Sequence, residues 1–193
     1  MSDNNDIILI DRAFSPTLFK HMKQWIFSEE FSWSFMESTG ISEITDNFSF
    51  GRYLYKDGNR IFPESYIVEA GFATMLDNCR LNITQLHRIR VGLITKSAER
   101  ITNTAHVDHN EPHLTALIYL NTTDAPTYLY DTFYDFKSNM SADEFSKTKK
   151  LSIVKMIPCI ENTAVIFDGA RYHSSNSPTD VSRRVVLNFN FNI

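Results

Sequence analysis

Residues 105–120 of the chain have the sequence AHVDHNEPHLTALIYL, in which a histidine and an aspartate two residues apart precede a run of apolar and β-branched residues. The run is one of six after about residue 83 that are rich in strand-favouring residue types, with turn residues between most of them. The six expected strands are Gln85–Thr95, His113–Leu120, Thr127–Phe133, Leu151–Met156, Thr163–Phe167 and Val181–Phe191.

The first half of the chain is expected to contain two helices. One begins at the Ser15-Pro16 pair, which supplies an N-cap and a favoured first helical position, and extends to about Glu30. The other extends from Pro63 to about Leu81. The segment between them, rich in aromatic residues, Ser, Asn and Gly, predicts short strands and loops. Helices followed by many short strands predict an α+β fold, mainly β, in which helices pack on one side of an antiparallel sandwich or barrel.

Length and charge limit the class of protein. A chain of 193 residues without a Gly-, Pro- or Ser-rich linker is expected to form one domain, 1–193, with a helical part to about residue 82 and a β core from about 83. The net charge of −4 with both signs scattered does not indicate nucleic-acid binding. An acidic start and the absence of a long apolar run predict no membrane span and a cytoplasmic location. The oligomeric state does not follow from the sequence.

Three residues form a candidate metal site. In an extended chain, residues two apart point to the same face, so His106 and Asp108 are able to share a metal ion. The segment FDGARYHSSNSP adds His173, and two histidines with one carboxylate form the facial triad of non-haem Fe(II) oxygenases. A structural zinc site would instead need four protein ligands, often cysteines, and Cys79 and Cys159 are far apart in the sequence. His109 has the opposite parity to Asp108 and is expected at the surface or behind the ligands.

The last expected strand offers a partner for a dicarboxylate, because arginine binds carboxylates with two parallel hydrogen bonds. Alternation separates the two candidates. One face carries Arg183, Val185, Leu187, Phe189 and Phe191, and the other carries Arg184, Val186, Asn188 and Asn190. The first face suits packing on the helices and the second is polar enough to line a site, which favours Arg184 over Arg183. Tyr119 lies on the face of its strand shared with Thr115 and Leu117, a position that an ordinary amphipathic strand also explains.

From about Gln85 to the C-terminus these residues resemble the prolyl 4-hydroxylase-like group of 2-oxoglutarate/Fe(II)-dependent dioxygenases. The signature of that group is His-x-Asp, a distal histidine and an arginine about ten residues further on, matched here by His106, Asp108, His173 and Arg184. TALIYLN is similar to the strand whose tyrosine contacts 2-oxoglutarate in the group, and Tyr119 occupies that place. RVVLNFNF resembles the closing strand that carries the arginine.

The resemblance implies a double-stranded β-helix, a jelly-roll or cupin-like core, with the N-terminal helices packed on one sheet. It also implies Fe(II), 2-oxoglutarate and dioxygen as cofactor and co-substrates. The implied reaction couples oxidative decarboxylation of 2-oxoglutarate, to succinate and CO2, with hydroxylation of a small molecule or of a peptide or protein, for which a prolyl residue is one candidate. Two positions depart from the group: residues 124–127 are DAPT where Gly-Gly-x-Thr is frequent, and Val186 stands where Ser or Thr is common.

Two other interpretations stay open at this point. A catalytically inactive metal-binding jelly roll that serves as a ligand-binding module would keep the triad without needing Arg184 and Tyr119, and a purely structural jelly roll would need no metal ligands. The polar segment Asp135–Lys150 is either a solvated insertion or a lid, and Ser141 and Glu144 within it predict a short helix near 141–148. This segment and residues 31–62 are the expected substrate-contacting loops.

Overall fold

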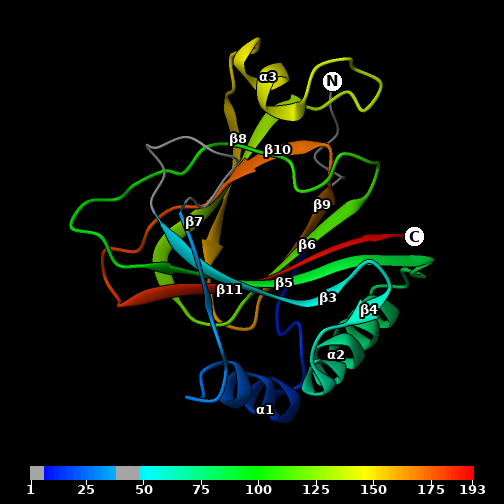
Figure 1. The fold of residues 1–193 in the computed structure, drawn as a ribbon, viewed down its shortest axis with the longest axis vertical. Helices are drawn as coiled ribbons and strands as arrows, with labels where there is room; N and C mark the ends of the chain where they lie inside the picture. Colours follow the sequence, from blue (N-terminus) through cyan, green and yellow to red (C-terminus); the bar gives the residue numbers. More distant parts are fainter. Residues whose placement is uncertain (1–6, 38–47) are drawn as a thin grey trace.

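The structure is a computed structural model that describes residues 7–37 and 48–193, so the acidic start and the middle of the 31–62 segment lie outside the described residues. Its strands form two antiparallel sheets (Figure 1). The larger sheet contains β1 (Ile8–Ile10), β2 (Ser34–Met36), β3 (Ser49–Lys56), β4 (Asn59–Arg60), β5 (Gln85–Thr95), β6 (Leu114–Tyr119), β9 (Ala164–Asp168) and β11 (Arg183–Asn192). The smaller sheet contains β7 (Thr123–Phe133), β8 (Ile153–Cys159) and β10 (Arg171–Ser174).

The strand order places the long strands at the centre of the larger sheet. Among the described residues the order is β1-β9-β6-β11-β5-β3-β2 with β4 paired to β3, and the smaller sheet has the order β10-β7-β8. β1 and β3 precede residue 83 and yet pair with β9 and β5 of the expected core, so the two expected parts of the chain share one sheet. The two facing sheets confirm the mainly β, double-stranded β-helix architecture.

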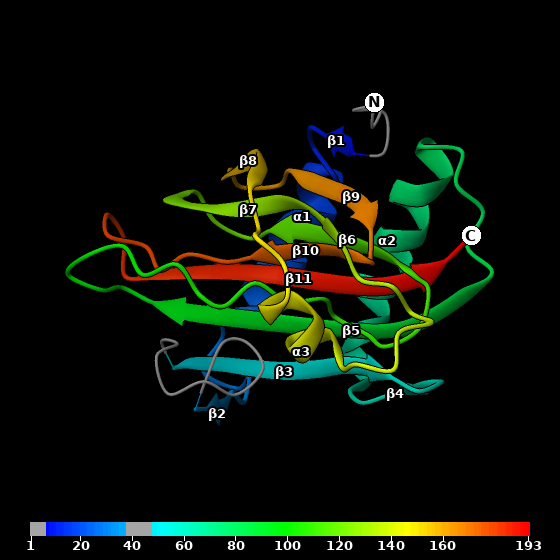
Figure 2. The same cartoon turned by 90° about the horizontal axis from the view of Figure 1, so that it is seen from above.

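Helices α1 (Pro16–Ile26) and α2 (Tyr66–Asn78) lie on the face of the larger sheet that points away from the smaller sheet, as Figures 1 and 2 show. The apolar face of β11 meets them: Phe189 stacks on Phe72 with ring centroids 4.0 Å apart, and Val185, Leu187 and Phe191 belong to the same buried cluster. Leu117, Tyr119 and Val186 belong instead to a second cluster between the sheets. The alternation predicted for β11 is therefore confirmed.

Most element boundaries agree with the sequence, and the differences have local causes. β5 has the predicted bounds. α3 (Ala142–Lys147) begins with the predicted capping box between Ser141 and Glu144. α1 ends at Ile26, before the expected Glu30, because the chain turns there: the Ser28 hydroxyl donates to the Trp25 carbonyl at 2.8 Å and Phe31 packs on Trp25.

Two features of the smaller sheet differ from the prediction. β7 begins at Thr123 rather than Thr127, and its register with β8 shifts between these residues, where Pro126 has no N–H to donate to the ladder. His173 lies on β10, a short strand of the smaller sheet that is not among the six expected strands. None of the described helices is long and apolar enough to cross a membrane.

Candidate metal centre and pocket

On the face of the larger sheet that points toward the smaller sheet, here called the inner face, polar side chains from neighbouring strands lie side by side. Asn188 on β11 pairs with Arg90 on β5 and with Leu117 on β6. The next row along β11 pairs Asn190 with Arg88 on one side and with Thr115 on the other. Residues paired in this way point to the same side of an antiparallel sheet. The face predicted to line a site therefore does so with side chains from three strands.

The structure brings His106, Asp108 and His173 together. His106 and Asp108 lie on the segment between β5 and β6, and His106 exchanges backbone hydrogen bonds of 2.9 and 3.0 Å with His173 on β10. The Nε2 atoms of His106 and His173 lie 3.9 and 3.6 Å from the Asp108 carboxylate oxygens. One ligand atom from each residue lies within 4.8 Å of the others. This is a compact set of two nitrogen donors and one oxygen donor.

Backbone carbonyls orient both imidazoles. Nδ1 of His106 lies 3.1 Å from the Thr104 carbonyl and Nδ1 of His173 lies 3.2 Å from the Arg171 carbonyl. A carbonyl oxygen only accepts hydrogen bonds, so Nδ1 carries the proton in each ring and the Nε2 lone pair faces Asp108. Metal-ligating histidines are commonly held in this way, which fixes the tautomer and the ring orientation.

The Asp108 carboxylate is held by four described side chains. Arg88 donates to Oδ1 at 2.9 Å, and Asn188 donates to both oxygens at 3.1 and 3.0 Å. Asn190 and Thr115 donate to Oδ2 at 3.1 and 3.2 Å. With only 6% of its side chain exposed, the carboxylate has a defined position behind the two Nε2 atoms.

Burial and charge set the protonation states of the triad. Burial lowers the pKa of His173 to about 4, because removal from water disfavours the charged ring, although Asp108 opposes this. Burial alone would raise the pKa of Asp108, but His173, Arg88 and His106 together hold it well below the usual range of an aspartate. At neutral pH the site therefore offers a neutral His173 and an anionic Asp108, the forms that bind a metal ion.

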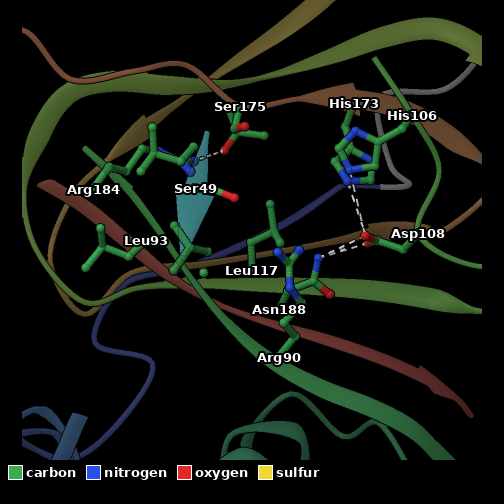
Figure 3. A pocket seen from close by; sticks show the side chains of 14 residues that line it. Ser49, Arg90, Leu93, His106, Asp108, Leu117, His173, Ser175, Arg184 and Asn188 are labelled. Atoms are coloured by element: carbon green, nitrogen blue, oxygen red, sulfur yellow. Dashed lines mark hydrogen bonds and ion pairs between the residues drawn. The ribbon is translucent and has the colours of Figure 1, made fainter. Parts of the chain in front are cut away.

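A pocket extends from the triad along the inner face of the larger sheet, with an empty volume of about 620 Å³ that includes its open mouth. Figure 3 shows the triad on one side of it and Arg184 on the other. The pocket is lined by Ser49, Arg90, Gly92, Leu93, Ile94, His106, Asp108, Leu117, Thr127, His173, Ser175, Arg184, Val186 and Asn188.

Arg184 lies at the far end of this pocket from the triad and is only 4% exposed. Its guanidinium donates to Thr127 Oγ1 at 2.8 Å and to the Ala125 carbonyl at 3.1 Å. Tyr119 is fully buried beside it, with its hydroxyl 2.8 Å from Thr127 Oγ1 and its ring 5.6 Å from the guanidinium carbon. Burial raises the pKa of Tyr119 to about 12, so the hydroxyl keeps its proton and is able to donate.

Arg183 lies outside this pocket. The residue is exposed, and its guanidinium covers the ring of Phe27, just after α1, at 4.7 Å from the centroid. Of the two arginines, the structure therefore places Arg184 in the pocket and Arg183 on the helix side of the sheet. Thr127 is the residue kept from the Gly-Gly-x-Thr pattern, and Val186, at the departing position, lines the pocket.

The other histidines near the triad lie away from the ligand atoms. The His109 ring contacts the rings of His87 and His113, at centroid distances of 5.5 and 5.8 Å. His113 is buried and hydrogen-bonds the Glu111 carbonyl through Nδ1 at 2.7 Å. None of these three belongs to the group of potential metal ligands found among the described residues.

Arg88 and Arg90 are site residues that the sequence analysis missed. The signal was present in QLHRIRVGLIT, where Ile89 and Val91 alternate with Arg88, Arg90 and Gly92. Ile89 and Val91 are fully buried against the helices, so the other face of β5 must look into the space between the sheets. The same alternation that separated Arg183 from Arg184 would have placed Arg88 and Arg90 in the site.

Known structures with this architecture include several oxygenases. A 2OG-Fe(II) oxygenase family oxidoreductase from Burkholderia pseudomallei superposes with a TM-score of 0.66 at 10% identity, covering 98% of this chain and 86% of that one. The fold is that of the 2-oxoglutarate/Fe(II) oxygenases. No protein-family model and no curated protein sequence matches the chain.

Two further structures with this fold differ in what they bind. A prolyl hydroxylase from Trichoplax adhaerens, in complex with a hypoxia inducible factor peptide fragment, has a TM-score of 0.62 at 13% identity and covers 97% of this chain and 84% of its own. The epimerase SnoN, in complex with Fe3+, alpha ketoglutarate and nogalamycin RO, has a TM-score of 0.64 at 10% identity, with coverage of 96% and 78%. Within this fold, a peptide and a small molecule are thus both represented among the bound partners.

Proposed function

We propose that the chain is a non-haem Fe(II) oxygenase that uses 2-oxoglutarate and dioxygen, with iron bound by His106, Asp108 and His173. The observation that carries the proposal is the pairing of this triad with a buried arginine at the other end of the same pocket. The triad alone suits several divalent metals. A buried guanidinium with a tyrosine and a threonine beside it adds a site for a carboxylate.

The residues present fit both groups. The Nε2 atoms of His106 and His173 face an anionic Asp108, and three ligands leave room for further coordination at the same ion. Bound together, iron and 2-oxoglutarate would supply the activation of dioxygen, with succinate and CO2 as co-products and a hydroxylated substrate.

The side chains of the pocket would bind the co-substrate and orient the metal ligands. Arg184 and Tyr119 would hold the distal carboxylate of 2-oxoglutarate, with Thr127 fixing both donors. Arg88, Asn188, Asn190 and Thr115 keep Asp108 in place. Leu117 and Val186 keep the wall of the pocket between its two ends apolar, which excludes water from the bound co-substrate.

The fold is compatible with more than one class of substrate. Hydroxylation of a small molecule or of a peptide or protein, including a prolyl residue, is compatible with the fold, because solved structures of this architecture hold both kinds of partner. We expect the protein to act in the cytoplasm, as a single domain comprising 1–193.

Anaerobic addition of Fe(II) and 2-oxoglutarate to metal-free protein tests the proposal. We expect the visible absorption of the iron chelate to develop, and succinate to form when oxygen is admitted. His106→Ala is expected to abolish both signals. If wild-type protein develops no absorption and forms no succinate, the proposed enzyme activity is contradicted. That result would favour the alternative, a metal-binding jelly roll without oxygenase activity. Unchanged metal content in His106→Ala and His173→Ala would favour a purely structural fold.

A further inference from the structure

Arg90 is a second arginine in the pocket, and the proposed function gives it no part in binding iron or 2-oxoglutarate. It extends from β5 beside Asn188, its partner across the ladder, onto the floor of the pocket (Figure 3). Among the described residues its guanidinium forms no ion pair, and its hydrogen-bond partner is the sulfur of Met36, 2.7 Å from Nη2. A thioether is a weak acceptor, so most of the five N–H donors of this guanidinium lack a strong partner.

The nearby anion does not satisfy Arg90. Asp108 is already held by Arg88 and by the three polar side chains around it. Burial and the positive charge of Arg88 lower the pKa of Arg90 from its usual value, although Tyr53 and Asp108 oppose this, and the guanidinium stays charged at any physiological pH. The Arg90 side chain is only partly exposed, and a bound anion would stabilise its charge more than its thioether contact does.

Arg90 and Arg184 serve different ends of the pocket. Arg184 pairs with Ile94 and Arg90 with Asn188, so the two rows lie four residues apart on β11, about 13 Å along the strand. Asn188 contacts Asp108, which places Arg90 at the metal end of the pocket. A carboxylate bound by Arg184 at the far end leaves the Arg90 guanidinium free for a second ligand next to the reacting centre.

The Arg90 side chain packs against β3 on one side and borders two hollows. Gly51 on β3 lies against the guanidinium: a Cβ there would approach Arg90 Nη2 to 2.8 Å and Met36 Sδ to 2.9 Å. Arg90 also borders a neighbouring hollow lined in part by Phe35, Met36 and Tyr53. The Arg90 guanidinium therefore lies between the metal pocket and a hollow lined in part by apolar and aromatic side chains.

We propose that Arg90 binds a carboxylate of the primary substrate, so that the oxygenase acts on a carboxylic acid with an apolar body. The proposal rests on the proposed function and makes it more specific. It favours a carboxylate-bearing substrate over an internal residue of a peptide, whose amides are neutral. Arg90 thereby holds the substrate beside the metal, while Arg184 and Tyr119 hold the co-substrate.

Matched acids and amides test the proposal. The probes are benzoate, phenylacetate and N-acetyl-L-proline, each with its neutral amide, titrated calorimetrically into protein loaded with Mn(II) in place of iron and with 2-oxoglutarate. We expect at least one acid to bind about tenfold or more tightly than its amide, since charge-assisted hydrogen bonds are lost in the amide. In Arg90→Gln the difference between acid and amide is expected to disappear.

Control variants separate Arg90 from other positive charges. Arg183→Gln removes the same charge from the helix side of the sheet and should retain the preference for the acid. Gly51→Ala keeps the charge but forces the Arg90 and Met36 side chains to move, and should weaken acid binding. The KM for 2-oxoglutarate should rise less in Arg90→Gln than in Arg184→Gln, because Arg184 and not Arg90 is proposed to bind the co-substrate.

Three results would overturn the proposal: equal binding of acids and amides by wild-type protein, an unchanged preference in Arg90→Gln, or a rise in the KM for 2-oxoglutarate as large in Arg90→Gln as in Arg184→Gln. The last result would assign Arg90 to the co-substrate. If Mn(II) and 2-oxoglutarate do not bind, the proposed oxygenase function fails, and the acid and amide titrations of metal-free wild type and Arg90→Gln still decide the role of Arg90.

Discussion

At the scale of single residues, Arg183 and Arg184 differ in the face of β11 on which they lie. Arg184 is buried beside Tyr119 and Thr127, whereas Arg183 covers Phe27 on the helix side. Replacing Arg184 by Gln removes charge-assisted hydrogen bonds to a carboxylate, each worth about 1.5–3 kcal/mol. We expect the KM for 2-oxoglutarate to rise about tenfold or more in Arg184→Gln, measured by succinate formation, and to change less than about twofold in Arg183→Gln. Equal effects in both variants would contradict the assignment.

His173 gives a residue-scale prediction for stability in the absence of metal. Its pKa is about 4 when folded, because the ring is buried, whereas an unfolded histidine titrates near about 6.5. Between these pH values the unfolded chain binds more protons, so the free energy of unfolding falls as the pH falls. The expected contribution of His173 is a loss of about 2 kcal/mol between pH 7 and pH 5.

Urea unfolding in the presence of EDTA checks this prediction. His173→Gln removes the titrating ring, so its stability should fall less than that of wild type between the two pH values. Asp108 does not obscure the comparison: its folded pKa lies below the usual value, so the stability that it contributes is lost below about pH 4. His21→Gln, at an exposed position on α1, is the matched control. Identical pH dependence in wild type and His173→Gln would show that burial of the ring does not depress its pKa.

At the scale of elements, β5 shapes the pocket through Gly92. This residue pairs with Val186 and lines the pocket, and a Cβ built on it would meet nothing within 4 Å. Gly92→Val should therefore fill pocket space without displacing a neighbour. Valine suits a strand better than glycine, so stability should be unchanged or higher by up to about 1 kcal/mol, while binding of 2-oxoglutarate weakens about tenfold or more. Thermal unfolding measures the stability and calorimetric titration measures the binding of 2-oxoglutarate. Unaltered binding of 2-oxoglutarate in Gly92→Val would show that the co-substrate does not lie next to Gly92.

The strands also explain which residues of the site could be predicted from the sequence. Alternation along a strand has a period of two and needs no knowledge of the fold, which is why β11 could be divided into a helix face and a site face. Tyr119 was placed by resemblance, and the structure puts it beside Arg184. The strand that carries His173 could not be predicted, because Arg171–Ser174 is short and pairs with β7, which lies far away in the sequence. The contact of Arg88 with Asp108 likewise depends on where the segment after β5 returns to the sheet.

At the scale of the whole molecule, the triad connects the two sheets. His173 belongs to β10 of the smaller sheet, Asp108 is held by Asn188 and Asn190 of the larger sheet, and His106 bridges to His173 through the backbone. A metal ion bound by all three would therefore tie the sheets together, and since the unfolded chain does not gather these ligands, binding should stabilise the folded state.

The expected size of this stabilisation follows from mass action. A metal concentration of about 100 times the Kd adds about 2.7 kcal/mol, which for a chain of this length corresponds to a rise in Tm of about 5–10 °C. Thermal unfolding of metal-free protein with and without Mn(II) measures the rise. His106→Ala and His173→Ala should lose it, whereas His109→Ala should keep it, because His109 contacts other histidine rings and not the ligand atoms. An equal rise in all three variants would place the metal elsewhere and remove the basis for iron at the junction of the two sheets.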